Sequence, residues 1–204
     1  MLNLGEIELE IPSWEQIYKM LLNLADKIKK DGFKPDVLVG VCRGGWPPAR
    51  VLSDLLENPQ LANVKVEFYA GVAETKGEPV ITQPVSVSVM GKKVLVVDDV
   101  TDTGESLRLV KQHLDEMGAT EVKVATIYYK PWSKLVPDYY EKKTSKWIVF
   151  PWERKESVTS LIKKYLKNGK SVEEAKRKLI ESGMNKEQVE KFAEEALKKL
   201  GAHS

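Results

Sequence analysis

The sequence predicts an α/β fold in which an open parallel sheet is flanked by helices, with a small appendage of three helices at the C-terminal end. Two short, fully apolar runs, 37–41 and 94–97, are typical of strands that are buried on both faces of a parallel sheet. Each leads through a polar turn containing glycine into an amphipathic stretch with a helical period. After residue 155 only helical periodicity remains, so we predict two domains, 1–154 and 155–204.

The first elements are a helix over residues 13–30, a strand over 37–41 and a helix over 48–56. Ser13 is a suitable N-cap for the first helix, which should end near Gly32. Residues 64–70 alternate between apolar and polar side chains and predict an edge or half-buried strand. Residues 71–84 have few apolar side chains, and we interpret them either as a functional loop or as the polar tip of a hairpin.

The turn after the strand 37–41 reads Arg43-Gly44-Gly45. Glycine allows positive φ angles and close approach of the backbone to another group. The guanidinium of Arg43 offers paired donors that suit phosphate oxygens. A plain glycine turn with a solvated arginine is the alternative interpretation.

The stretch 94–107 is the centre of the prediction. The buried strand ends in two adjacent carboxylates, Asp98 and Asp99, which repel one another unless hydroxyl groups or a cation satisfy them. The turn that follows, 101–106, feeds the N-terminus of a helix, where backbone N–H groups and the helix dipole favour a phosphate. Together they indicate a sugar-phosphate site with a metal nearby. The alternative, in which Asp98 and Asp99 are solvated and Thr103 is merely an N-cap, leaves most of these polar residues unexplained.

The second half continues with a helix over 107–117, ended by Gly118, and an apolar strand over 121–129. Lys130 follows at the carboxyl end of that strand, the edge where open parallel sheets bind ligands. Residues 134–146 are polar. Three amphipathic helices are expected over 157–168, 171–182 and 185–200, and Ser171 with Glu174 forms a capping box. We interpret these helices as a packing or dimer-stabilising appendage.

Composition excludes several classes of protein. The net charge of +2, from 32 basic and 30 acidic residues, gives no general affinity for nucleic acid. No apolar run approaches the roughly 18 residues of a membrane span, so we expect a soluble, cytoplasmic protein. A single cysteine, Cys42, leaves no pair for an intrachain disulfide. The abundance of lysine and glutamate is typical of thermophilic proteins.

Residues 96–107 resemble the signature of type I phosphoribosyltransferases, which bind 5-phosphoribosyl 1-diphosphate (PRPP). The resemblance implies that Asp98 and Asp99 hold the ribose hydroxyls. It also implies that the 5′-phosphate is bound, mostly through backbone groups, by Thr103, Gly104, Glu105 and Ser106. Arg43 and Gly44 resemble the loop that holds the pyrophosphate, often through a cis peptide. The family's mobile loop would fall in 71–84 and close over PRPP.

Other residues resemble the members that act on 6-oxopurines. Asp102 matches an aspartate that exchanges a proton with the purine N7, and Lys130 matches a lysine that donates to the exocyclic oxygen. Trp147 and Ile148 resemble a pair that stacks on the base and reads its edge, although Trp147 could instead be a core residue. Glu153 stands where the family has an aspartate that reaches Mg²⁺ through water, and Asp99 is a second candidate for the metal.

The resemblance implies transfer of the phosphoribosyl group of PRPP to N9 of guanine, xanthine or hypoxanthine, with Mg²⁺ as cofactor and pyrophosphate as product. It also implies a homodimer or a larger homo-oligomer. Two alternatives stay open: a PRPP-sensing regulator of the same fold, and a phosphoribosyltransferase for another base. A regulator would not need Asp102, Lys130 and Trp147 together.

Overall fold

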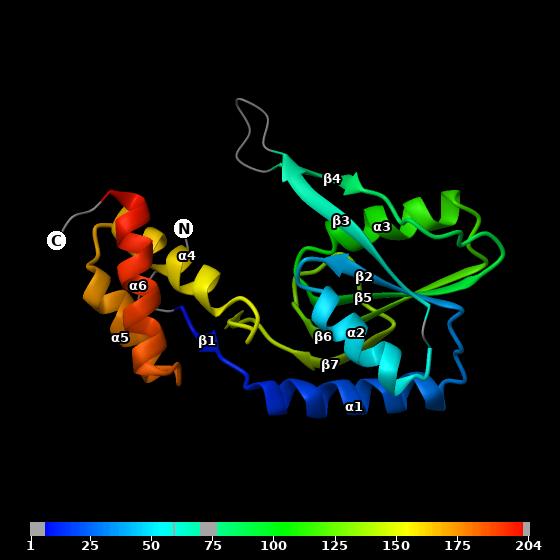
Figure 1. Cartoon of the computed structure of the whole chain (residues 1–204), viewed down its shortest axis with the longest axis horizontal. Coiled ribbons are helices and arrows are strands. Elements are labelled where there is room, and N and C mark those ends of the chain that lie inside the picture. Colours follow the sequence, from blue (N-terminus) through cyan, green and yellow to red (C-terminus); the bar gives the residue numbers. More distant parts are fainter. Residues whose placement is uncertain (1–6, 59, 70–76, 202–204) are drawn as a thin grey trace. The chain divides into compact units, whose positions relative to one another are not determined.

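The computed structural model describes residues 7–58, 60–69 and 77–201 (Figure 1). It divides into two compact units. The larger is formed by the described residues of Glu15–Ser145, and the smaller by those of Met1–Trp14 together with Lys146–Ser204. The boundary expected from the sequence, between residues 154 and 155, remains a prediction about domains.

The larger unit contains a six-stranded sheet with the order β4-β3-β2-β5-β6-β7. Neighbouring strands are parallel except for the antiparallel pair β3–β4. This confirms the predicted open parallel sheet. The strands are β2 (Val37–Cys42), β3 (Leu61–Tyr69), β4 (Glu78–Gln83), β5 (Lys93–Thr101), β6 (Glu121–Tyr129) and β7 (Tyr139–Lys143).

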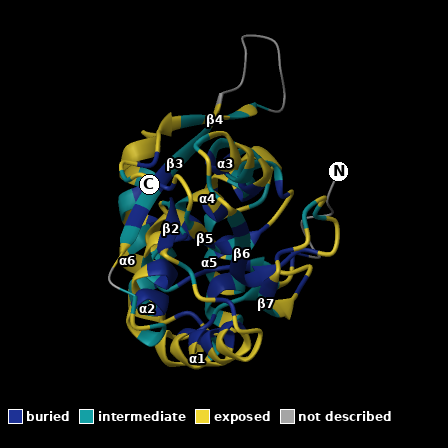
Figure 2. Ribbon diagram, turned by 90° about the vertical axis from the view of Figure 1, so that its right-hand side faces the viewer, coloured by how far each residue is buried: buried dark blue, intermediate teal, exposed yellow. Residues whose placement is uncertain are grey.

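Helices cover both faces of this sheet, with α1 (Trp14–Lys30) and α2 (Trp46–Leu55) on one face and α3 (Glu105–Glu116) on the other (Figure 1). Residues 94–97 are fully buried, because their side chains alternate between the two faces and both faces are covered. Figure 2 shows this buried layer between the helices. Burial on both faces explains why the apolar runs identified the central strands.

Two strands of the sheet were missed by the sequence analysis. Residues 78–83 form β4. The interpretation of 71–84 as a loop is therefore wrong for this part, and the alternative of a hairpin describes it. Residues 70–76 lie outside the described residues. Residues 139–143 form β7, within a stretch expected only to be polar. Both strands lie at the edges of the sheet and, apart from the buried Tyr139, are partly or fully exposed, so they lack the apolar signal of a buried strand. An edge position also tolerates Pro79.

The smaller unit contains a short parallel pair, β1 (Leu9–Glu10) and β8 (Trp147–Ile148), and three helices. The helices are α4 (Arg154–Lys167), α5 (Val172–Glu181) and α6 (Lys186–Leu200), which confirms the predicted appendage. The capping box of Ser171 and Glu174 is present. The first of these helices begins earlier than predicted, at Arg154, so that Ser157 is buried inside α4.

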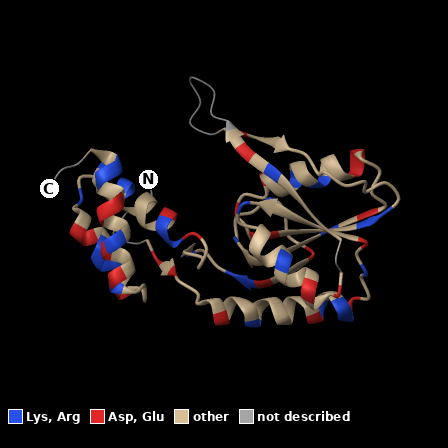
Figure 3. Ribbon diagram, viewed as in Figure 1, with Lys and Arg blue, Asp and Glu red and all other residues tan. Residues whose placement is uncertain are grey.

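Basic and acidic residues are interspersed along the helices of each unit, in keeping with the small net charge (Figure 3). Among the described residues, none of the helices combines the length and the apolar character that crossing a membrane requires.

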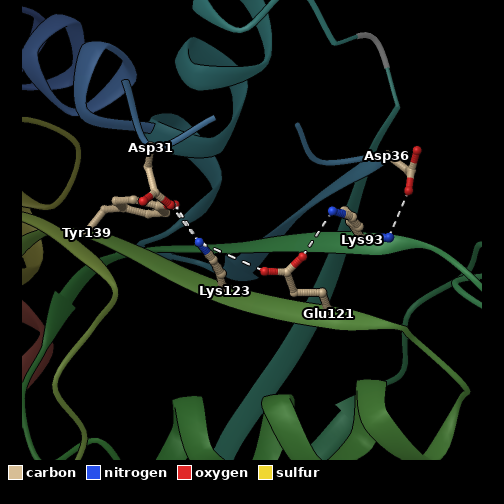
Figure 4. Close-up of polar contacts among 6 residues, drawn as sticks. All are labelled: Asp31, Asp36, Lys93, Glu121, Lys123 and Tyr139. Carbon is tan, nitrogen blue, oxygen red and sulfur yellow. Dashed lines mark hydrogen bonds and ion pairs between the residues drawn. The ribbon is translucent and has the colours of Figure 1, made fainter. Parts of the chain in front are cut away.

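A polar network ties the end of α1 to the first residues of β6 and β7 (Figure 4). Lys123 Nζ lies 2.6 Å from Asp31 Oδ2 and 3.1 Å from the Tyr139 hydroxyl oxygen, and this hydroxyl donates to Asp31 Oδ2 at 2.5 Å. The ammonium group also lies 4.8 Å from the centre of the Phe33 ring. The hydrogen bond between Lys123 and Asp31 raises the pKa of the lysine and lowers that of the carboxylate. Burial, then the bond to Asp31, raises the pKa of Tyr139 to about 12.

Lys123→Met is expected to lower the melting temperature by a few degrees, because it removes an ion pair and a cation–π contact together. Asp31 stabilises the fold above its unfolded pKa of roughly 4, and Lys123 does so below its unfolded pKa of roughly 10. The difference in melting temperature between the native protein and Lys123→Met should therefore be largest between these two pH values and become smaller below and above them. Thermal melts across this pH range measure it.

Lys93→Met is the matched control for this prediction. Lys93 pairs with Glu121 at 3.2 Å, but both side chains are more exposed than Lys123, and exposed pairs contribute little. An equal loss in the two variants would contradict a special role for the network around Lys123.

Candidate active site

A cleft of about 360 Å³ opens at the carboxyl end of β5. This is the edge of a parallel sheet where ligands are usually bound. The lining comes from the end of β5, the turn 101–104 and the first turn of α3, with Phe68 and Gly77 from the β3–β4 hairpin added. The cleft therefore includes six of the predicted site residues: Asp98, Asp102, Thr103, Gly104, Glu105 and Ser106.

The turn before α3 is shaped by Gly104, which is the N-cap of the helix and has a φ of +83°. Only glycine adopts such an angle easily. Thr103, the N-cap of the alternative interpretation, lies one residue before the observed N-cap, and its hydroxyl accepts a hydrogen bond from the Glu105 N–H at 3.4 Å. The first N–H groups of a helix have no partner within the helix, so this turn offers donors to an anion.

The adjacent carboxylates Asp98 and Asp99 lie beside this turn. The Asp99 backbone N–H donates to Asp98 Oδ1 at 2.9 Å, and the Asp99 side chain is buried. Burial, and next the negative charge of Asp99, raise the pKa of Asp98 well above its ordinary value. The pair is thus suited to partners that donate hydrogen bonds or carry positive charge.

The Arg43 turn lies against this acidic pair. A Cβ atom added at Gly44 would fall inside the Asp99 carboxylate, only 2.6 Å from its Cγ atom. One added at Gly45 would meet backbone atoms, including the Asp98 Cα at 2.8 Å. The close approach of neighbouring atoms thus explains why both residues are glycine. Neither has a positive φ, which is the other reason that the sequence analysis considered. The Cys42–Arg43 peptide bond is cis, as the resemblance implies.

Asp102 has a partner that the sequence analysis missed. The indole N–H of Trp132 donates to Asp102 Oδ1 at 2.8 Å. Lys130 is buried, and its Nζ atom lies 5.5 Å from the centre of the Trp132 ring. The only signal in the sequence was an aromatic residue two positions after Lys130, at the end of a strand.

The loop that carries Trp132 is fixed to the turn before α3 by its backbone. The Lys130 N–H donates to the Thr101 carbonyl at 2.9 Å, and the Lys134 N–H donates to the Thr103 carbonyl at 3.0 Å. Lys134 also pairs with Glu105 at 3.5 Å, so this acid is turned toward a lysine at the surface. The two segments 101–105 and 130–134 form one structure at the edge of the sheet.

The remaining predicted residues belong to the smaller unit. Ile148 is buried and pairs with Glu10 in the short sheet. Trp147 is partly buried and packs against the core of the three helices, with Lys164 Nζ 5.4 Å from the centre of its ring. Glu153 directly precedes α4. Their assigned roles in binding the base and the metal stay predictions.

An open parallel sheet whose central strand ends in paired carboxylates and an anion-binding turn defines a class of α/β proteins that bind sugar phosphates. Residues 9–157 match the phosphoribosyl transferase domain family, and the chain belongs to this family. The match ends near the start of α4, so most of the helical appendage lies beyond it.

Relatives with assigned names fall in the same family. The crystal structure of a purine phosphoribosyltransferase from Pyrococcus horikoshii is 42% identical, covers 72% of this chain and 94% of that chain, and superposes with a TM-score of 0.64. A xanthine-guanine phosphoribosyltransferase from Gluconobacter oxydans is 29% identical over 69% of this chain and 82% of its own length. One from Cereibacter sphaeroides is 30% identical over 69% of this chain and 84% of its own length.

Proposed function

We propose that this protein is a purine-salvage phosphoribosyltransferase, which transfers the 5-phosphoribosyl group of PRPP to N9 of a 6-oxopurine and releases pyrophosphate. The observation that carries this proposal is that one cleft combines an acidic residue of the pair 98–99, an anion-binding turn and Asp102. Relatives named as purine and xanthine-guanine phosphoribosyltransferases support it.

PRPP fits the chemistry of the cleft group by group. The carboxylates of Asp98 and Asp99 would accept hydrogen bonds from the ribose hydroxyls, and such donors would offset the burial and the repulsion by Asp99 that raise the pKa of Asp98. The N–H groups of the turn 103–106 would bind the 5′-phosphate. Arg43 and Gly44, next to the acidic pair, would bind the pyrophosphate.

The transfer step needs positioning and the movement of one proton. N9 forms a bond to C1′ while the bond from C1′ to the pyrophosphate oxygen breaks, and positive charge develops on the ribose. The proton on the purine N7 passes to Asp102, which acts as a general base. Lys130 would donate to the exocyclic oxygen O6, because a lysine offers only donors.

A divalent cation fits this site. In the part of the chain that the structure describes, no three side chains of histidine, cysteine, aspartate or glutamate are grouped to hold a metal by themselves. Magnesium is commonly held by one or two carboxylates together with substrate phosphates, which matches the pair of Asp98 and Asp99. We infer that Asp99 would hold Mg²⁺, while a contact of Glu153, a residue of the smaller unit, with the ion through water stays what the family resemblance implies. When bound, the ion would neutralise charge on the departing pyrophosphate.

Pyrophosphate release tests the proposal. The protein is incubated with PRPP, Mg²⁺ and in turn guanine, hypoxanthine, xanthine, adenine, orotate and uracil. Turnover with one or more of the three 6-oxopurines, and with none of the other bases, is the expected result. Turnover with another base alone would make the protein a phosphoribosyltransferase of different specificity. PRPP binding without turnover across the panel would instead identify a sensor.

Trp147→Ala is expected to raise the KM for the purine about five- to 150-fold, because stacking of a base on an aromatic ring contributes about 1–3 kcal/mol. The KM for PRPP should change little. Trp147→Phe retains an aromatic ring and is the matched control. Since Trp147 also packs against the helices, melting temperatures must be measured in parallel. A lower melting temperature with an unchanged KM would identify a core residue.

We also infer a homodimer or a larger homo-oligomer, as the family resemblance implies. Light scattering coupled to size exclusion measures the mass in solution against the 23.1 kDa of one chain. A mass of one chain at micromolar concentration would contradict this inference.

A further inference from the structure

Asp102 and Lys130, the two residues assigned to the purine edge, come from different segments of the chain. Asp102 is exposed on the turn after β5, and Lys130 is buried at the end of β6. N7 and O6 of a 6-oxopurine lie on the same edge of the base. A carboxylate that takes the N7 proton and an ammonium that donates to O6 must therefore be held at a fixed spacing.

The indole of Trp132 contacts both groups. Its N–H donates to Asp102 Oδ1 at 2.8 Å, and its ring faces Lys130 Nζ at 5.5 Å from the ring centre. Trp132 is 54% exposed, so packing in the hydrophobic core does not account for the position of its ring. The backbone bonds from Lys130 to Thr101 and from Lys134 to Thr103 hold its loop against the turn that carries Asp102.

We propose that Trp132 is a positioning residue that orients the Asp102 carboxylate and the Lys130 ammonium toward one edge of the purine. This inference rests on the proposed function. The indole N–H fixes one carboxylate oxygen and leaves the other to accept the N7 proton.

The charged groups near Asp102 stay in place when Trp132 is replaced. Among the described residues, the charged groups on the segments packed around it are Asp98 and Asp99 on β5, Glu105 on α3, and Lys130 and Lys134 on the loop after β6. Glu105 and Lys134 pair with each other. Replacing Trp132 by phenylalanine changes none of these charges, so a lower kcat reports the lost N–H donor.

Trp132→Phe keeps a ring for Lys130 and removes the donor to Asp102. We expect kcat to fall about ten- to hundred-fold, the range for losing a hydrogen bond to a charged group, with the KM for PRPP unchanged. Trp132→Leu also removes the ring and should in addition raise the KM for the purine.

A double variant separates positioning from a general loss of structure. If Trp132 acts through Asp102, Trp132→Phe combined with Asp102→Asn should be no slower than Asp102→Asn alone. Trp14→Phe makes the same chemical change on an exposed tryptophan of α1 and should leave kcat unchanged. Additive losses in the double variant, or a native kcat for Trp132→Phe, would overturn the proposal.

A spectroscopic readout does not depend on turnover. The chain has five tryptophans, and the Trp132 indole N–H resonance of ¹⁵N-labelled protein is the one absent from Trp132→Phe. It should shift as Asp102 titrates in the native protein and stay constant in Asp102→Asn. A titrating resonance without turnover on any base would reject the proposed function but keep the contact. A resonance that ignores Asp102 would reject the positioning role, whatever the activity.

Discussion

Asp102→Asn is expected to lower kcat about ten- to ten-thousand-fold, the range for loss of a general base. Asparagine has nearly the same shape, and its oxygen can still accept the indole N–H of Trp132, so the turn should keep its structure. What it loses is the ability to take the N7 proton. Steady-state kinetics with a 6-oxopurine and calorimetric titration with PRPP measure the two effects separately.

This prediction is tested by comparing the change in kcat with the change in affinity for PRPP. The affinity for PRPP should stay nearly native, because the acidic pair and the phosphate-binding turn are untouched. Asp26→Asn, an exposed residue of α1, is the control for removing one negative charge. A variant that bound PRPP weakly but turned over at the native rate would show that Asp102 acts on the sugar phosphate and not on the base.

Gly44→Ala is expected to weaken PRPP binding at least about ten-fold, and to lower the free energy of unfolding by about 1–3 kcal/mol, as overpacked sites usually do. The added methyl group would overlap the Asp99 carboxylate, so either the Arg43 turn or the acidic side chain must move. Both are assigned to PRPP. Titration with PRPP and thermal melts measure the two consequences.

Gly91→Ala is a suitable comparison for this variant. Gly91 has a φ of +72°, but the space around it is open, so alanine there meets backbone strain and no neighbour. It should cost stability, about 1 kcal/mol, without a change in PRPP affinity. Native PRPP affinity in Gly44→Ala would show that contact between the Arg43 turn and Asp99 is not needed for binding.

The buried part of the fold was predictable from the sequence, and its edges were not. Strands β2, β5 and β6 are covered on both faces, so apolar side chains dominate their sequences, and the helices beside them keep a clean period. Strands β4 and β7 have a partner on one side only and bury little apolar surface. Their pairing is decided by backbone hydrogen bonds with a neighbour, which leave little trace in residue type.

The candidate site divides in the same way. The acidic pair and the turn before α3 are contiguous in the chain, and their residue types suffice to predict the chemistry. The contact of Trp132 with Asp102 joins residues 30 positions apart, and it follows from how the loop after β6 returns to the turn after β5. Similarly, the sequence predicts that the glycines of the Arg43 turn allow close approach. It does not predict that Asp99 is the residue that approaches.

The packing of Trp147 gives the helical appendage a structural role. The strand that carries Trp147 shares one hydrophobic core with α4, α5 and α6, which otherwise carry no assigned chemistry. Heat that loosens this core, or a substitution at Leu161 or Leu179, should therefore also loosen the packing of Trp147. The three helices therefore hold Trp147, and the residues of their shared core determine how rigidly its ring is held.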